Sequence, residues 1–160
     1  MEQIIIRKAE QSDFDTLLIF EQGVIHAEKP FDSTLKNDPI NYYDIKKMIA
    51  ANDVELVVAT LKNKIIGSGY ARIEDTKPYL KHSQHAYLGF MYVIPEFRGK
   101  GVNKLIIDAL AKWSASKNII ELRLDVYHNN TPAISAYEKA GFSKHMVEMR
   151  MEIDIDCLKK

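Results

Sequence analysis

Residues 93–104 form a basic turn with two glycines, between an apolar run and a helical pattern. The preceding run, 86–93, is apolar and aromatic, as expected of a buried strand. A helix that starts at Gly101 directs its free backbone N–H groups into the turn, and Gly99 and Gly101 let a ligand approach the backbone. Basic side chains add to the positive end of the helix: Arg98, Lys100 and Lys104. The turn predicts a phosphate site, and a turn with solvated basic side chains is the alternative.

A second polar segment, residues 125–142, reads as a strand end, a turn and a short helix that glycine stops. Thr131 and Pro132 suit the N-cap and first position of this helix, and Gly141 suits the position after its end. Tyr137 lies three residues after Ile134, so both share one helix face. Taken by itself, this pattern favours a half-buried core tyrosine with a satisfied hydroxyl.

The composition favours one cytoplasmic domain, residues 1–160. The chain has 22 basic and 22 acidic residues, so no global field attracts nucleic acid or an anionic membrane. No apolar stretch approaches the roughly 20 residues of a membrane span, and the N-terminus has no cationic leader. The single cysteine, Cys157, excludes an internal disulfide, which suits a reducing compartment.

The apolar patterning predicts an α/β sandwich around a mixed sheet. Strands are expected over residues 4–7, 55–61, 64–73, 86–93 and 119–127, with one or two more in 142–155. Helices are expected after a capping box at Ser12 and Asp15, from Asp38-Pro39, from Gly101 and over 131–140. The segments 26–37 and 74–84 are expected to be loops.

The two polar segments together resemble the GNAT superfamily of acetyl-CoA-dependent N-acetyltransferases. Arg98-Gly-Lys-Gly-Val-Asn103 is similar to its pyrophosphate loop, Gln/Arg-x-x-Gly-x-Gly/Ala. Asn130-x-x-Ala133, followed by Ala136-Tyr137-Glu-Lys-Ala-Gly141-Phe142, is similar to its second cofactor motif. The resemblance covers residues 87–142. Asn103 stands where the family has glycine or alanine, but a loop that binds through backbone N–H groups tolerates it.

The resemblance implies a GNAT-like α/β fold, in which six or seven mostly antiparallel strands are flanked by about four helices. It also implies acetyl-CoA as cosubstrate, with no metal. Ten residues would contact it: Met91, Val93, Arg98, Gly99, Lys100, Gly101, Val102, Asn103, Lys104 and Asn130. The strand that ends at Val93 would separate from the next strand to admit the pantetheine arm, and a backbone N–H near Tyr92 or Val93 would bind the oxyanion.

The resemblance further implies direct attack of a primary amine on the thioester. Tyr137 stands where many family members carry the general acid that protonates the thiolate. Asp125 stands five residues before the motif asparagine, where relatives that acetylate protein N-termini carry an acidic base. A structural role, as a partner for Arg123 or as a backbone cap, is the alternative for Asp125. Lower-ranked bases are Glu74, His85 and His128, and an amine that arrives neutral needs none.

Other functions fit the residues less well. A catalytically silent module that binds acyl-CoA is the main rival, because the strand before the turn lacks a glutamate. The turn lacks the spacing of a nucleotide-binding P-loop, His82 and His85 lack a third metal ligand, and Cys157 lacks the setting of a nucleophile. The acceptor, a small-molecule amine or a peptide amine, stays open. A homodimer is an assembly that the resemblance allows.

Overall fold

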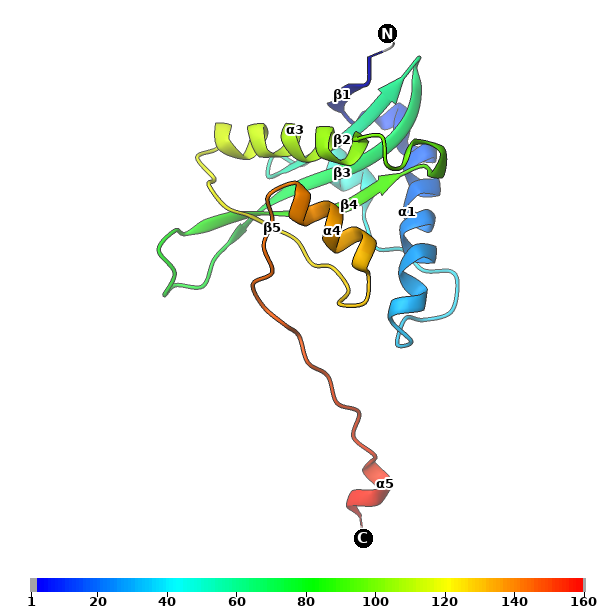
Figure 1. Cartoon of the computed structure of the whole chain (residues 1–160), viewed down its shortest axis with the longest axis vertical. Helices are drawn as coiled ribbons and strands as arrows, with labels where there is room; N and C mark the ends of the chain where they lie inside the picture. The colour runs from blue at the N-terminus through cyan, green and yellow to red at the C-terminus, as the bar shows by residue number, and fades with distance from the viewer. Residues whose placement is uncertain (1–2, 160) are drawn as a thin grey trace.

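The computed structural model describes residues 3–159 and contains a five-stranded sheet in the order β1-β2-β3-β4-β5 (Figure 1). The strands are β1 (Ile5–Lys8), β2 (Val54–Leu61), β3 (Lys64–Asp75), β4 (Gln84–Val93) and β5 (Leu122–Arg123). The α-helices are α1 (Phe14–Glu28), α2 (Ile45–Ala50), α3 (Val102–Ser116), α4 (Thr131–Lys139) and α5 (Ile155–Leu158). The first three strand pairs are antiparallel and β4–β5 is parallel. The predicted fold class is confirmed, whereas the expected six or seven strands are five among the described residues.

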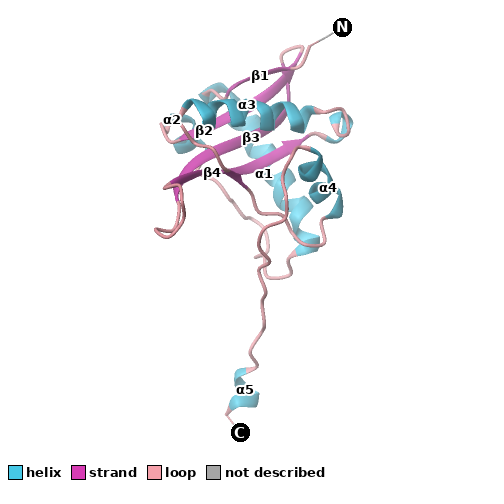
Figure 2. Cartoon of the chain, turned by 60° about the vertical axis from the view of Figure 1, so that its left-hand side comes forward, coloured by secondary structure: helices cyan, strands magenta, loops and turns pink. Residues whose placement is uncertain are grey.

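The inner strand β2 is buried on both faces, because helices cover the sheet on each side. Val57 and Ala59 belong to the apolar cluster that includes α3, whereas Leu56 and Val58 belong to the cluster with α1 and α2. Successive side chains of a strand point to opposite faces, so this alternation follows from the pleat. Figure 2 shows α3 on one face of the sheet and α1 on the other.

The predicted hairpin of β2 and β3 is confirmed. Its two-residue turn places Lys62 at φ 48° and Asn63 at φ 63°, the left-handed pair that a tight antiparallel connection requires. Asparagine tolerates this conformation better than most residues do, because its short side chain bonds locally. The turn type and the strand register are therefore local consequences of the sequence.

The start of the first helix differs from the prediction. The capping box forms between Glu10 and Asp13, before a short 3₁₀ turn, and not between Ser12 and Asp15. The Asp13 carboxylate accepts two bonds from Arg7 of β1, at 2.7 and 2.9 Å, and one from the N–H of Glu10 at 2.8 Å. A tertiary contact with the first strand therefore selects the capping residue.

The second helix begins at Ile45, and the prediction that it starts at Asp38-Pro39 is wrong. The buried carboxylate of Glu21 in α1 accepts the N–H groups of both Tyr42 and Tyr43 at 2.7 Å. These bonds hold the chain extended up to Asp44, whose side chain then caps the helix by accepting from the N–H of Lys47. The loop prediction for 26–37 is also wrong at its start, since α1 continues to Glu28.

Two strand predictions near the C-terminus fail in part or entirely. Residues 119–127 contain only the two-residue strand β5. Residues 143–154 pair with no strand among the described residues and lead away from the sheet to α5 (Figures 1 and 2). The alternation of their side chains predicts a strand, but a strand forms only by pairing, and no strand among the described residues pairs with this segment.

Candidate active site

The glycines of the basic turn adopt backbone angles that side chains disfavour. Gly99 has φ +72° and Gly101 has φ +80°, both left-handed, and a Cβ built on either would meet nothing within 4 Å. The requirement for glycine is therefore conformational, and the space beside the turn is open to a ligand. Both glycines match the sequence prediction of a turn shaped for close approach.

The N-terminus of α3 faces this turn with its first backbone N–H groups. Gly101 is the N-cap and supplies no capping side chain, and the first bond of the helix runs from the N–H of Leu105 to the carbonyl of Gly101, at 3.2 Å. The N–H groups of Val102, Asn103 and Lys104 precede this bond and have no partner within the helix. Together with the helix dipole they form a site suited to an anion.

The three basic residues of the turn are arranged differently from one another. Arg98 donates from Nε to the carbonyl of Val93 at 2.9 Å, which holds its guanidinium between the end of β4 and the turn. Lys100 lies over the ring of Phe97, 5.0 Å from its centroid. Lys104 pairs with Asp108 along α3 at 2.6 Å, so its charge is partly neutralised. Arg98 and Lys100 are the better candidates for phosphate contact.

The last residues of β4 have an edge without a strand partner. β5 pairs with β4 only at Ala86 and Tyr87, and Phe90 then takes φ 54° beside a register shift against β3. The N–H of Ile94 bonds the carbonyl of Ile66 on β3, at 3.0 Å. Because backbone groups alternate along a strand, those of Val93 and Met91 point to the opposite, unpaired side. Both predicted cofactor-binding residues therefore present free N–H groups there.

Tyr137 is held by the end of α4. The N–H of Phe142 bonds the carbonyl of Tyr137 at 3.0 Å, and that of Gly141 bonds the carbonyl of Glu138 at 3.1 Å. This pair of bonds is a Schellman motif, with Gly141 at the predicted position and φ +105°. The rings of Phe142 and Tyr137 meet edge to face at 5.9 Å, as that motif favours. The sequence motif thus fixes the direction of the tyrosine side chain.

The Tyr137 hydroxyl stays protonated at neutral pH. Burial raises its pKa to about 12, and the negative charge of Glu28 contributes to the same shift. A protonated hydroxyl can donate to a thiolate. The carboxylate that acts on Tyr137 is therefore Glu28 rather than Asp125.

Asn130 caps α4, a role that the prediction assigned to Thr131. Its Oδ1 accepts from the N–H of Ala133 at 3.3 Å, and Thr131 and Pro132 follow inside the helix. The amide nitrogen of the same side chain remains a donor, because capping uses only the oxygen. Capping and cofactor binding by Asn130 are compatible.

Asp125 accepts a hydrogen bond from Tyr87 of β4, at 3.1 Å, across the point where β4 and β5 separate. The carboxylate is exposed, and among the described residues its hydrogen bond is to Tyr87 and not to Arg123 or Tyr137. Burial raises the pKa of Tyr87, and the charge of Asp125 raises it further. The sequence suggested Arg123 as an alternative partner of Asp125, but in the structure the partner is Tyr87.

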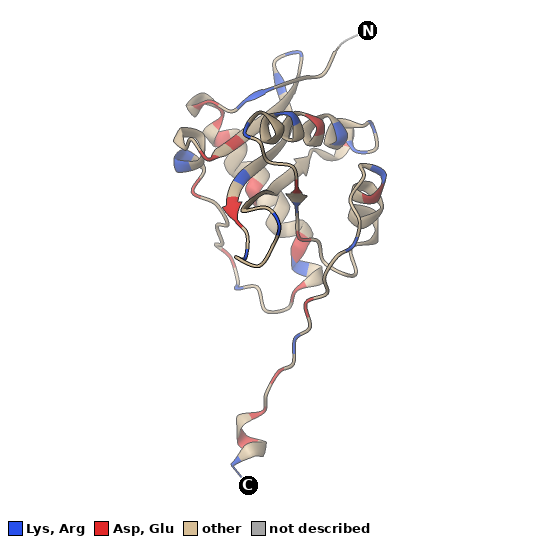
Figure 3. Ribbon diagram, turned by 90° about the vertical axis from the view of Figure 1, so that its left-hand side faces the viewer, with Lys and Arg blue, Asp and Glu red and all other residues tan. Residues whose placement is uncertain are grey.

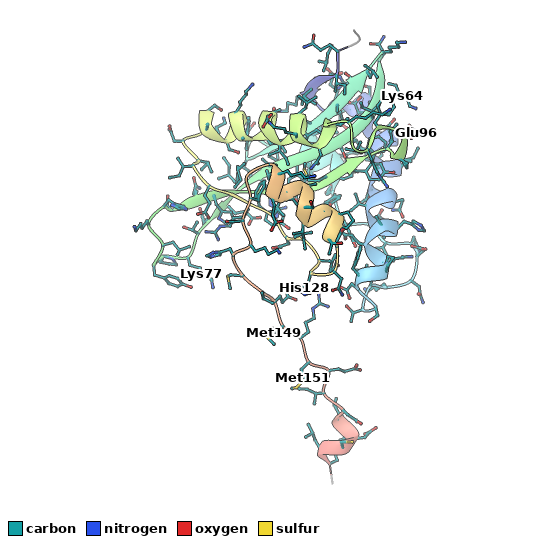
Figure 4. The ribbon with its side chains drawn as sticks, in the orientation of Figure 1. Lys64, Lys77, Glu96, His128, Met149 and Met151 are labelled. Carbon is teal, nitrogen blue, oxygen red and sulfur yellow. The ribbon has the colours of Figure 1, made fainter. Side chains whose placement is uncertain are left out.

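The lower-ranked bases lie elsewhere. Glu74 accepts from Arg72 at 2.6 Å and lies 3.4 Å from His85, at the end of β4 opposite Val93. His82 contacts Glu121 at 2.9 Å, so the two histidines have different carboxylate partners. His128 is exposed in the turn before α4 (Figure 4). Among residues 3–159 no group of three or more His, Cys, Asp or Glu is arranged to hold a metal ion.

Glu28 is the residue whose importance the sequence did not reveal. It is the last residue of α1, burial raises its pKa, and Tyr42 forms a hydrogen bond to it. Its charge also raises the pKa of Tyr43, Tyr127 and Tyr137, so one carboxylate acts on four tyrosine hydroxyls. The sequence placed Glu28 and the tyrosines in separate segments, and only the fold brings them together.

Asp32 extends this acidic and aromatic region. The Tyr127 ring stacks on Phe31 with centroids 5.9 Å apart, and its hydroxyl donates to Asp32 at 3.3 Å. Hydrogen bonds from Thr34, and secondarily the charge of Arg150, lower the pKa of Asp32 to about 2. Two carboxylates four residues apart, Glu28 and Asp32, therefore lie among several aromatic side chains, an environment suited to a cation.

The chain is similar to known proteins that are named as acetyltransferases. The "Streptothricin acetyltransferase" of Escherichia coli is 41% identical over 46 residues, 29% of this chain and 26% of that protein. The chain thus matches about a quarter of the length of that relative. The "Acetyltransferase YE1169" of Yersinia enterocolitica is 27% identical over 154 residues, 93% of this chain and 96% of that protein.

Solved structures share the fold. A predicted acetyltransferase with acetyl-CoA from Clostridium acetobutylicum has a TM-score of 0.70 and 22% identity, over 94% of this chain and 96% of that chain. A mutant of the BH1408 protein from Bacillus halodurans has a TM-score of 0.84 and 21% identity, over 93% and 99%. No helix within residues 3–159 is long and apolar enough to cross a membrane.

Residues 21–142, most of the chain, match the family model described as "Acetyltransferase (GNAT) family". The matched range contains the glycine turn, the free edge of β4 and the Tyr137 helix. The chain belongs to the acetyltransferase (GNAT) family.

Proposed function

We propose that this protein transfers an acetyl group from acetyl-CoA to the primary amine of a small cationic molecule, by direct attack in a ternary complex. One observation carries the proposal: Met91 and Val93 of β4 pack against the same apolar cluster as Tyr137 of α4, and the turn with Gly99 and Gly101 follows the end of β4. An anion site, free N–H groups and a protonated hydroxyl are the parts that acetyl transfer from CoA requires.

The cofactor would bind mainly through backbone groups. Its pyrophosphate would accept N–H groups of residues 99–104, with charge from Arg98 and Lys100. The pantetheine amides would pair with the free backbone groups of Met91 and Val93, and the Asn130 amide nitrogen would donate from the other side. Asn103 would contribute its N–H, so its side chain does not conflict with this role.

The acceptor amine must lose a proton, because a lysine-like amine has a pKa of about 10.4. Glu28, whose charge acts on Tyr137, is the first candidate base, and Asp125 is the second, acting through water. Of the N–H groups of Met91 and Val93, one would bind the pantetheine arm and the other the oxyanion. The Tyr137 hydroxyl would donate its proton to the departing thiolate, whose thiol form has a pKa of about 8.5. The tyrosine would then regain a proton from the amine nitrogen, which is positively charged after it attacks the thioester.

The acidic and aromatic residues favour a cationic small molecule over a peptide. Glu28 and Asp32 supply negative charge, and Tyr42 and Tyr127 supply ring faces for an ammonium group. Relatives of this chain carry the names streptothricin acetyltransferase and aminoglycoside N(6')-acetyltransferase, which are consistent with a small polar amine as acceptor. A protein N-terminus or a lysine remains the competing acceptor.

The test is release of free thiol from acetyl-CoA over a panel of polyamines, aminoglycosides, amino acids and short peptides. Turnover with polycationic small molecules, at a KM below that for peptides, is the expected result. CoA binding in calorimetry without turnover on any acceptor would favour the rival function, a silent module that binds acyl-CoA. Turnover on peptides alone would overturn the assignment of the acceptor but not of the cofactor.

A further inference from the structure

β4 contains an extra residue beyond its short pairing with β5, and Phe90 takes an unusual conformation there. Ser68 of β3 pairs with Tyr92 of β4. The next pair is Tyr70 with Gly89, so one residue of β3 stands opposite two residues of β4. Such an insertion is a β-bulge, which redirects the backbone and is common beside active sites. Phe90 has φ 54°, a left-handed angle that a bulky side chain rarely adopts, so the surrounding structure must hold it in place.

The glycine next to Phe90 does not take the left-handed angle, because it serves a different purpose. A Cβ built on Gly89 would lie 2.6 Å from the ring of Tyr70, so this position needs glycine for space. Phe90 is buried, and its ring centroid lies 4.6 Å from that of Tyr43. The left-handed angle therefore falls on a buried phenylalanine that packing holds in place.

A serine on β3 holds the carbonyl of this phenylalanine. Oγ of Ser68 donates to the carbonyl of Phe90 at 3.0 Å, and Ser68 is fully buried. Its pairing neighbour on β2, Val58, belongs to the apolar cluster that includes α1 and α2. β4 contains no Lys, Arg, Asp or Glu, and β3 contains none between residues 65 and 71 (Figure 3). A hydroxyl is costly to bury in such surroundings unless it has a partner, and the irregular peptide supplies that partner.

The bond from Ser68 also sets the direction of the next N–H group. The carbonyl of Phe90 and the N–H of Met91 belong to one planar trans peptide, in which the two groups point in opposite directions. Ser68 holds the carbonyl toward β3, so the N–H of Met91 points away from β3. On that side β5 pairs with β4 only as far as Tyr87. A hydrogen bond at one end of a rigid unit therefore orients the donor at its other end.

We propose that Ser68 is a positioning residue for acetyl transfer, which directs the Met91 N–H at the carbonyl oxygen of the acetyl group. This inference rests on the proposed function. The pyrophosphate would bind at residues 99–104, which follow Val93, so the acetyl end of the cofactor would lie further back along β4, nearer to Met91. The Met91 N–H would then bind the oxyanion, and the Val93 N–H would bind the pantetheine arm. Ser68 acts only through the peptide between Phe90 and Met91.

Steady-state kinetics of Ser68→Ala, with acetyl-CoA and an amine that the native protein acetylates, test this role. Loss of the hydroxyl frees the peptide to rotate, so the oxyanion donor is misdirected. We expect kcat to fall by roughly 10- to 100-fold, whereas the Kd for CoA, measured by calorimetry, should change by less than about threefold. CoA has no acetyl oxygen, so its affinity does not depend on the oxyanion donor.

Two further variants separate the hydroxyl from the volume of the side chain. Ser68→Thr and Ser68→Val introduce side chains of nearly the same size, and only threonine keeps the hydroxyl. The threonine variant should keep a kcat at least about tenfold above that of the valine variant, and thermal unfolding measures the strain that both share. Ser114→Ala is the matched control, because Ser114 is also buried and donates to a carbonyl, that of Leu110 in α3, at 2.8 Å. Its kcat should equal that of the native enzyme.

The amide of Met91 gives a readout that a merely structural role of Ser68 would not change. In isotope-labelled protein without an amine, replacement of CoA by acetyl-CoA should move the Met91 amide proton downfield in the NMR spectrum, because the N–H gains a carbonyl acceptor. The same replacement should leave this resonance in place in Ser68→Ala.

The possible failures are distinguishable. A native kcat in Ser68→Ala, equal kcat values in the threonine and valine variants, or a Met91 resonance that moves equally in Ser68→Ala would overturn the role of Ser68 and leave the proposed function intact. A Kd for CoA that rises as much as kcat falls would assign Ser68 to cofactor binding instead. Failure of the native protein to release thiol with every amine would refute the proposed function, and this inference with it.

Discussion

Replacement of Tyr137 by phenylalanine tests the proposed chemistry with the least disturbance to the fold. The ring meets Phe142 at 5.9 Å, and the Schellman bonds at the end of α4 involve only the backbone. Phenylalanine keeps both features and removes only the hydroxyl. The thermal unfolding midpoint should therefore change little, and any loss of activity reports on the chemistry.

The expected loss is in kcat. General acid catalysis contributes about 10²- to 10⁴-fold, and we expect Tyr137→Phe to lower kcat by roughly 10²-fold or more. The pKa of Tyr137 is about 12, so the hydroxyl is protonated at every pH below about 11 and the loss should be the same from pH 6 to pH 9. The KM for acetyl-CoA should stay near the native value, because the cofactor is bound by backbone groups.

Thiol release measured with two acetyl thioesters separates proton donation from substrate positioning. A thioester of an acidic thiol leaves without a proton, so the loss caused by Tyr137→Phe should shrink with it. Tyr79→Phe is the matched control, since Tyr79 is 77% exposed in the loop between β3 and β4. An unchanged kcat in Tyr137→Phe at every pH, or an equal loss with both thioesters, would refute the general-acid role.

Three further predictions follow from backbone angle, charge and burial. Gly101→Ala should raise the Kd for CoA about tenfold in calorimetry, because a left-handed backbone conformation costs a residue other than glycine about 1–2 kcal/mol. Gly101→Asn should raise the Kd less, because asparagine tolerates φ +80° better than alanine does. Equal affinities of the native protein and both variants would exclude the turn from the CoA site. Glu28→Gln should raise the KM for a cationic amine and leave CoA binding unchanged. Burial raises the pKa of Glu28 and so disfavours its charged form in the folded state, so the unfolding free energy at pH 7 should not fall in this variant. An unaltered KM would remove Glu28 from the acceptor site. The hydrogen bond from Arg7 lowers the pKa of Asp13, so this carboxylate stabilises the fold at pH values above its unfolded pKa and loses that contribution as the pH falls through its folded pKa. Asp13→Asn should therefore lower the denaturation midpoint at pH 7 and lower it much less at pH 2. An equal decrease of the midpoint at both pH values would contradict the ion pair.

The sequence by itself determined the elements whose causes are local. Lys62 and Asn63 favour the tight turn of the β2–β3 hairpin through their own backbone angles. Gly99 and Gly101 are required by the turn that they form, and Gly141 by the end of the helix that it terminates. These causes act between neighbours in the chain, so the conformation of the turn at Gly99 and Gly101 and the end of α4 could be predicted without the fold.

Only the tertiary structure decided what depends on distant partners. The start of α2 depends on Glu21 of α1, and β5 pairs with β4 only at Ala86 and Tyr87, before the irregular residue Phe90. Glu28 and Tyr137 are far apart in the sequence, and only the fold brings the charge of Glu28 to act on the hydroxyl of Tyr137. Residues 147–155 show the reverse case. Their alternation is local and predicts a strand, but a strand forms only by pairing, and none of the described strands pairs with them.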